Sequence, residues 1–371
     1  MKIGTDQYNT FDTMTMDCWN DRVYYEGKEF PAGQFAAEIL NFAGVIHDPL
    51  LERITVLTAL VDDLSTAEKS KRHDIAAQLK PLLHDTVSWL YTCPPFCYCE
   101  SQGAYEDLEH ALSEERLDRD YEEGEAHLPY LALSSCEPIL RILVAIYNFC
   151  LLIRAFEKKY LRRAKRRNAD AFAKAAHECF DEDDSFLILL EQMPFGGVEE
   201  FFSYPRVITG FNYFQDENDE EKWKTAQRVI CKRAIDFYVF DLMNGLHHGH
   251  APSQCQGCGR YFLTTNGHTP KYCDGVAPQD NRYTCRQYGA MKHQKEQNKQ
   301  HPVYRLFNTR TDTIRKHHRR GKISDELRQE ALCLAGNYRD KALMNNDYAA
   351  DGYARDMELE HIYAEAEKRL K

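Results

Sequence analysis

Apolar residues recur at intervals of three and four over much of the first part of the chain, which is the period of an amphipathic helix. The pattern predicts helices at residues 33–46, 48–64 and 74–92. Asp48-Pro49 is a start signal for the second helix, and Pro81 predicts a bend in the third. Residues 1–32 carry aromatic residues without a helical period, so they favour a strand or an irregular arm.

Two longer helices are expected further along, at residues 138–167 and 220–246. The first is apolar in its first half and strongly basic in its second, "RAFEKKYLRRAKRR". A basic helix end is typical of a solvated terminus whose cations suit the helix dipole. The alternative is a patch that contacts nucleic acid.

The longest apolar run bears on membrane association. It extends from Ile142 to Ile153, is 12 residues long and contains Asn148, which is too short and too polar for a membrane span. No apolar signal segment follows the first residues, and the 13 cysteines are odd in number and unlike a secreted disulfide framework. We therefore expect a cytoplasmic protein without membrane partners, in which the thiols are reduced.

One group of cysteines has the spacing of a metal site. The pattern is Cys255-x2-Cys258-x14-Cys273-x11-Cys285. Zinc is held by four thiolates in a tetrahedron, and a C-x-x-C turn supplies two of them. Gly257 and Gly259 allow the tight turns that such a knuckle needs.

The segments around the cysteines predict a knuckle, a hairpin and a helix. "RYFLTT" and "PKYC" suggest two strands around Asn266-Gly267, a hairpin signal. Thr284 is a good N-cap for a helix that begins at Cys285. This order is that of a treble-clef zinc finger. His268 is the rival fourth ligand, and four unrelated cysteines are the remaining alternative.

The resulting fold class is mainly α. A chain of 371 residues is expected to form two or three domains. We expect a helical N-terminal domain at 1–250, a zinc finger at 251–300 and a helical C-terminal tail at 301–371. In this tail Ser324 is the expected N-cap of a helix, with an apolar stripe through Leu327, Ala331 and Leu334.

Charge is divided unequally along the chain. Residues 255–322 hold 14 Lys and Arg against four acidic residues, a formal charge of +10. Because the whole chain carries −11, the remainder carries −21. This imbalance indicates an anionic partner for the basic part, or that the basic part docks on the acidic remainder.

The basic segment is the predicted site of contact with DNA or RNA. Tyr288, Lys292, Lys295 and Lys299 are spaced by four, three and four, which places them on one face of a helix. Lys and Arg at this density neutralise phosphates with little sequence choice. The candidate nucleic-acid-binding residues are Arg286, Lys292, Lys295, Lys299, Arg315, Lys316, Arg319 and Arg320. The competing hypothesis is an adaptor module that binds another protein.

The cysteine core also resembles known families. "CQGCGRYFL…YCD…TCRQYGA" resembles a bacterial family of zinc-finger proteins, mostly from Firmicutes, that has no established activity. It is similar, more distantly, to the CGNR zinc-finger proteins. The resemblance covers about residues 254–292 and implies that Cys255, Cys258, Cys273 and Cys285 bind zinc. The likeness to the CGNR group implies a regulator of transcription.

An enzymatic role is not expected. The chain has no P-loop, no G-x-S-x-G, no H-E-x-x-H and no Rossmann glycine set. Two further clusters lack a clear ligand set and are interpreted as structural: the histidines of "GLHHGH", at the expected end of a helix, and the cysteines of "CPPFCYC". Their members are His247, His248, His250, Cys93, Cys97 and Cys99.

Overall fold

The chain divides into two compact units in the computed structural model, residues 1–273 and 274–371. The structure describes residues 13–43, 49–99, 102–118, 121–123, 126–128, 130–164, 166–191, 206–216, 219–265, 267 and 270–370. The protein is mainly helical, as predicted, with several small sheets. The expected domain boundaries after residues 250 and 300 stay a prediction.

Residues 14–31 form strands, which confirms one of the two alternatives expected for residues 1–32. They belong to an antiparallel sheet of the first unit, which was not expected inside a helical body. Its strand order is β3-β2-β1-β7-β6. The residues near the N-terminus form a meander, and β1 pairs with β7 from more than 200 positions later, for example Met14 with Cys231. The strands are β1 (Met14–Trp19), β2 (Arg22–Tyr25), β3 (Lys28–Pro31), β6 (Val207–Asp216) and β7 (Asp219–Cys231).

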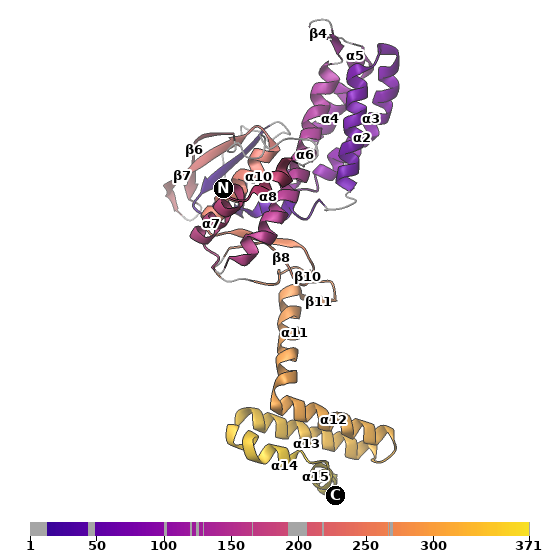
Figure 1. The fold of residues 1–371 in the computed structure, drawn as a ribbon, viewed down its shortest axis with the longest axis vertical. Coiled ribbons are helices and arrows are strands. Elements are labelled where there is room, and N and C mark those ends of the chain that lie inside the picture. Colours follow the sequence, from indigo (N-terminus) through magenta and orange to yellow (C-terminus); the bar gives the residue numbers. More distant parts are fainter. Residues whose placement is uncertain are drawn as a thin grey trace. The chain divides into compact units, whose positions relative to one another are not determined.

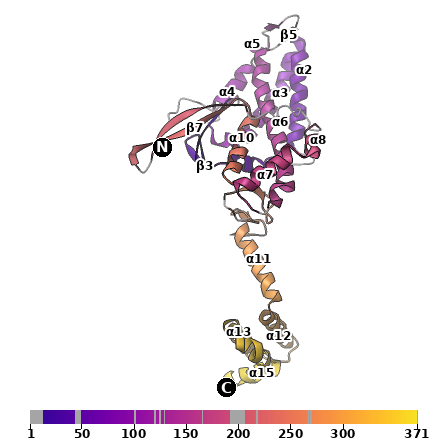
Figure 2. The ribbon, with the colours of Figure 1, turned by 60° about the vertical axis from the view of Figure 1, so that its left-hand side comes forward.

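The helix predicted at 220–246 is therefore wrong in its first half. Residues 219–231 form β7, and the helix α10 occupies only Ala234–His247. Thr225, Val229 and Ile230 are β-branched and favour a strand, and β7 pairs with β6 along most of its length. Beyond its contact with β1, the pair extends from the sheet as a two-stranded ribbon (Figure 2).

The remaining helices of the first unit form one hydrophobic core with the sheet. α2, α3, α4 and α6 lie side by side as a bundle (Figure 1). The predicted helix at 48–64 is confirmed as α2, and Pro81 lies inside α3. The bounds are α1 (Gln34–Ile39), α2 (Pro49–Thr66), α3 (Lys69–Leu90), α4 (Gln102–Ala111), α5 (Glu114–Leu117), α6 (Tyr130–Lys159), α7 (Ala169–Phe180) and α8 (Asp184–Glu191). A small hairpin, β4 (Tyr121–Glu123) with β5 (Ala126–Leu128), precedes α6.

The helix α6 replaces the one expected at 138–167, with both ends about eight residues earlier. The segment Ala132–Arg163 is the one helical stretch of the described residues that is long and apolar enough to cross a membrane. Its most apolar window is 61% buried inside the protein, which is typical of a core helix. The cytoplasmic location stays a prediction.

A buried carboxylate on α10 fixes α1 against it. The side chain of Asp241 accepts the backbone N–H groups of Gly33 and Ala36 at 2.9 Å each. Burial raises the pKa of Asp241 to about 7, against the lowering effect of these N–H groups. The two helices approach so closely that a Cβ on Gly245 would lie 2.8 Å from the Cα of Gly33. This contact holds the end of α1 beside the strands that carry the first cysteines.

The second unit is a small helical domain with its own core. Figure 1 shows α11 leading into the packed helices α12 and α13. Ser324 caps α13 by accepting the N–H of Leu327 at 3.2 Å, and Ala331 and Leu334 are buried, so the predicted cap and stripe are confirmed. The elements are β10 (Val276–Ala277), β11 (Asp280–Thr284), α11 (Cys285–Gln300), α12 (Pro302–Arg319), α13 (Asp325–Met344), a π-helix (Tyr348–Gly352), α14 (Tyr353–Asp356) and α15 (Leu359–Leu370).

Candidate metal centre

The four cysteines that the sequence pattern selected lie together. The Sγ atoms of Cys255, Cys258, Cys273 and Cys285 are all within 4.8 Å of one another. Cys255, Cys273 and Cys285 are buried, and Cys258 is half-buried. Among the described residues, these four are the one group of three or more His, Cys, Asp or Glu side chains that lie close enough together to bind a single metal ion.

The spacing of the sulfur atoms fits a tetrahedral metal ion. Metal–sulfur bonds of about 2.3 Å around zinc give tetrahedron edges of about 3.8 Å. The Sγ atoms of Cys258 and Cys273 are 3.6 Å apart, which is close to this edge and far longer than the roughly 2 Å of a disulfide bond. None of the four cysteines forms a disulfide bond. The site can therefore hold a metal ion without rearrangement of these two ligands.

The first two cysteines belong to the turn of a short hairpin. The strand β8 (Ala251–Gln254) pairs with β9 (Tyr261–Thr264), and Cys255 N–H donates to the carbonyl of Arg260 at 2.8 Å. Gly259 has a φ of 75°, as expected of a knuckle glycine. Gly257 contributes differently, because its N–H donates to Cys255 Sγ at 3.3 Å.

This hairpin corrects the expected one. "RYFLTT" contributes β9, but its partner is β8 and not "PKYC", which forms no strand. The knuckle therefore lies inside the hairpin, where two strands hold both ends of the C-x-x-C turn. Asn266 and the rival ligand His268 lie outside the described residues.

Backbone N–H groups point at the sulfur of Cys255. Burial raises the pKa of this thiol, but the N–H groups of Cys273, Cys258 and Gly257 outweigh burial and lower it to about 7. The N–H of Cys273 donates to Cys255 Sγ at 3.3 Å. A thiolate is the form that binds metal, so the local backbone favours the ligating state.

The fourth cysteine begins a helix, as predicted. Thr284 caps α11 in a capping box: its hydroxyl accepts the N–H of Gln287 at 3.2 Å, and the Gln287 side chain accepts the N–H of Thr284 at 2.9 Å. A short hairpin, β10 with β11, precedes it, and Cys285 N–H donates to the carbonyl of Gly275 at 2.7 Å. The helix dipole favours a thiolate at this position.

Two side chains from the first unit hold the hairpin that carries the knuckle. Arg167 is buried and donates to Thr264 Oγ1 at 3.1 Å and to the carbonyl of Pro252 at 3.4 Å. The side-chain amide of Asn41 accepts the backbone N–H of Tyr261 at 2.7 Å and donates to the carbonyl of the same residue at 3.0 Å. Both strands are therefore fixed from outside the hairpin. The sequence offered no signal for this, since the partners are distant along the chain.

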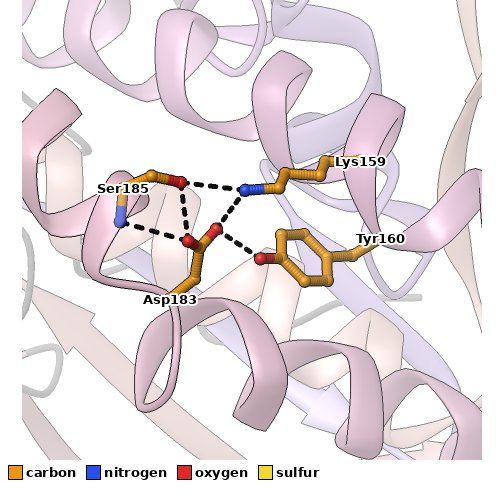
Figure 3. Close-up of polar contacts among 4 residues, drawn as sticks. All are labelled: Lys159, Tyr160, Asp183 and Ser185. Atoms are coloured by element: carbon orange, nitrogen blue, oxygen red, sulfur yellow. Dashed lines mark hydrogen bonds and ion pairs between the residues drawn. The ribbon is translucent and has the colours of Figure 1, made fainter.

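Other cations of the basic stretch 154–167 are also used inside the protein. Arg162 pairs with the buried Glu157 at 2.9 Å. Figure 3 shows Lys159 beside the carboxylate of Asp183, at 2.5 Å, and the hydroxyl of Ser185, at 2.9 Å. Tyr160 donates to the same carboxylate (Figure 3). Hydrogen bonds from Lys159, Ser185 and Tyr160 lower the pKa of Asp183, so it stays ionised and joins the end of α6 to the start of α8.

The predicted nucleic-acid-binding residues present a different environment. Those whose side chains are described are all exposed. Arg286 pairs with Asp274 at 3.0 Å and Arg315 with Asp312 at 3.2 Å. Among the described residues no ion pair engages the other five, Lys292, Lys295, Lys316, Arg319 and Arg320. The side chain of Lys299 lies outside the described part of the chain. Their role in binding stays a prediction.

The two remaining clusters have structural contacts. His247 is the last residue of α10, His248 is its C-cap, and Gly249 follows with a φ of 78°, as expected of a helix end. His250 contacts the carbonyl of Ala32 at 3.0 Å. In the other cluster, Cys93 is buried and Cys99 Sγ lies 3.2 Å from the hydroxyl of Tyr25.

The second unit contains a pocket that was not predicted from the sequence. It is lined by side chains of α11, α12 and α13, including Tyr304, Phe307 and Arg339. Tyr304 and Phe307 are three positions apart on α12, so they share a face. That spacing was a usable signal, but Arg339 comes from another helix and could be placed only by the fold.

The comparisons with known proteins give a similarity to one family and no activity. No curated protein and no solved structure matches the chain. Residues 203–369 contain β6, β7, α10, the four cysteines and the helices that follow. Over these residues the chain is similar to a family of unknown function, DUF6076.

Proposed function

We propose that the four cysteines hold a zinc ion that supports the fold, and that exposed cations of α11 and α12 contact the phosphates of nucleic acid. The proposed contact with nucleic acid rests on five lysines and arginines that are exposed and form no ion pair among the described residues. Cations that are not neutralised internally are available to an external polyanion.

A zinc ion with four thiolate ligands has no open position for water. Such a site is structural and does not activate a nucleophile. The order of elements supports a treble-clef interpretation: a C-x-x-C knuckle, a third cysteine, the β10–β11 hairpin and a helix that begins at the fourth cysteine. Zinc would thereby fix the N-terminus of α11, the helix that carries Lys292 and Lys295.

The cations of α11 are placed for backbone contact. Residues 291–297 of the helix are all exposed, including Lys292 and Lys295. These two are three positions apart and share a face of the helix. A second group of exposed cations lies at the C-terminal end of α12. It consists of Lys316, Arg319 and the C-cap residue Arg320. Phosphate contacts of this kind give affinity with little dependence on sequence.

The test is a mobility-shift titration over a series of salt concentrations. We expect Lys292→Glu with Lys295→Glu to weaken binding and to reduce the slope of log K against log salt. Two lost phosphate contacts should reduce the slope by about 1.4 to 1.8. The matched control is Lys71→Glu with Lys232→Glu, which makes the same charge change at two exposed lysines of the first unit.

Two results would contradict the proposal. One is a parent protein that binds neither DNA nor RNA at low salt. The other is an equal loss in the test and control variants, which would mean that only net charge matters. A partner protein captured from nuclease-treated lysate through the same lysines would instead support an adaptor.

A further inference from the structure

The pocket of the second unit is the feature that the proposed function does not yet explain. It has a volume of about 400 Å³, near the lower end of the range for small-molecule sites. Its lining combines two aromatic rings, two cations, two amides and a methionine: Tyr304, Phe307, Lys295, Arg339, Gln294, Asn308 and Met291. None of the described residues that line it is acidic.

The aromatic rings are held in place. Phe307 packs against the hydrophobic core of this unit, and the Arg339 guanidinium lies 4.6 Å from its ring centroid. Arg339 is itself fixed by Asp340, at 2.7 Å. Tyr304 is half-buried, and His301 contacts its ring edge-to-face with centroids 5.9 Å apart. A planar ligand would therefore meet preorganised rings.

The polar groups narrow the class of ligand. Gln294 and Asn308 line the pocket with amides that both donate and accept hydrogen bonds, which suits the edge of a heterocyclic base. Lys295 is exposed at the pocket and belongs to the same helix face as Lys292. An apolar side chain would use neither amide nor cation, and a free phosphate would not use the rings.

From this combination we infer that the pocket binds an unpaired nucleobase of a single-stranded nucleic acid whose phosphates contact Lys295 and Lys292. Bases in a duplex are stacked on both faces and cannot enter, whereas bases of a single strand stack on aromatic side chains. The inference rests on the proposed function and adds a preference for single strands.

The experiment measures the affinity of the full-length protein for a labelled oligonucleotide by fluorescence anisotropy. The oligonucleotide is used as a single strand and as a blunt-ended duplex of the same sequence. DNA and RNA versions are both used. The parent protein should bind one or both single strands more tightly than the corresponding duplex. Tyr304→Ala should weaken single-strand binding by roughly 5- to 100-fold, the effect of losing one stacked base. Tyr304→Phe keeps the ring and should bind within about threefold of the parent on the same grounds.

The outcomes separate this inference from the proposed function. Equal binding of duplex and single strand, unchanged by Tyr304→Ala, overturns the pocket and leaves phosphate contact intact. Absence of binding in the parent overturns both. Asn308→Ala, a change at an exposed residue, keeps the test valid if Tyr304→Ala fails to fold, and it should also weaken single-strand binding with little effect on the duplex.

Discussion

Two basic stretches of the chain look alike in sequence and differ in use. In residues 154–167 the side chains of Lys159, Arg162 and Arg167 contact partners inside the protein. In residues 315–320 the side chains of Lys316, Arg319 and Arg320 are exposed and form no ion pair among the described residues. Charge density alone therefore does not identify a binding surface, because contacts inside the protein determine whether a cation is available to an external ligand.

The largest expected effect is the loss of the zinc ion that is proposed to fix the N-terminus of α11, the helix that carries Lys292 and Lys295. Replacing Cys255 with Ser should reduce bound zinc from one per chain to a small fraction, as measured by elemental analysis. Structural zinc contributes on the order of 10 kcal/mol of apparent binding energy, so proteolysis within residues 255–299 should also accelerate. Cys333→Ser, at an exposed cysteine outside the cluster, should change neither quantity. Equal zinc in the two variants would contradict the site.

The next effect tests the internally used cations. Arg167→Ala should lower the free energy of unfolding by about 2 to 4 kcal/mol, because it removes a buried side chain and leaves Thr264 and Pro252 without their donor. Arg166→Ala changes an exposed neighbour and should stay within about 0.5 kcal/mol. Chemical denaturation measures both. Similar values would remove the distinction drawn between the two stretches.

A smaller, pH-dependent effect is expected at Lys159. Hydrogen bonds from Lys159, Ser185 and Tyr160 lower the pKa of Asp183 below 3.8. A depressed carboxyl pKa stabilises the fold above the unfolded value and is lost as pH falls through the folded one. Lys159→Ala should therefore destabilise at pH 7 and progressively less on acidification below about pH 4. Lys158→Ala, at an exposed lysine, should show no such pH dependence in thermal unfolding. A constant difference between them would show that the ion pair is not the cause.

The smallest effect on stability is expected in the second stretch. Lys316→Ala with Arg319→Ala removes two exposed cations that have no ion pair among the described residues. Exposed substitutions of this kind change the free energy of unfolding by about 0.5 kcal/mol or less each. A loss above about 2 kcal/mol by chemical denaturation, beyond the range for such sites, would show that these cations are already engaged.

The sequence predicted local features well. The cysteine spacing selected the four thiols that cluster, and the caps Thr284 and Ser324 start their helices as expected. These features depend on residues a few positions apart or on a ligand chemistry that fixes the residue type.

Features that depend on distant partners were missed. The strand at 219–231 was predicted as helix because its partners, β6 and β1, are set by the fold and not by the local pattern. The roles of Arg167 and Asn41 beside the knuckle likewise depend on contacts across about 100 to 220 positions. The position of Arg339 in the pocket could not be predicted for the same reason, because it contacts Phe307 from another helix.

The most direct test of the central claim compares the two stretches in one binding experiment. Nucleic-acid affinity is measured against salt for Lys316→Ala with Arg319→Ala, and for Lys159→Ala with Arg162→Ala, two cations that are paired inside the protein. If the cations of α12 contact phosphates, the slope for the first variant falls by about 1.4 to 1.8, while the second variant keeps the parent slope. Equal slopes in the two variants, or no change in either, would contradict the account.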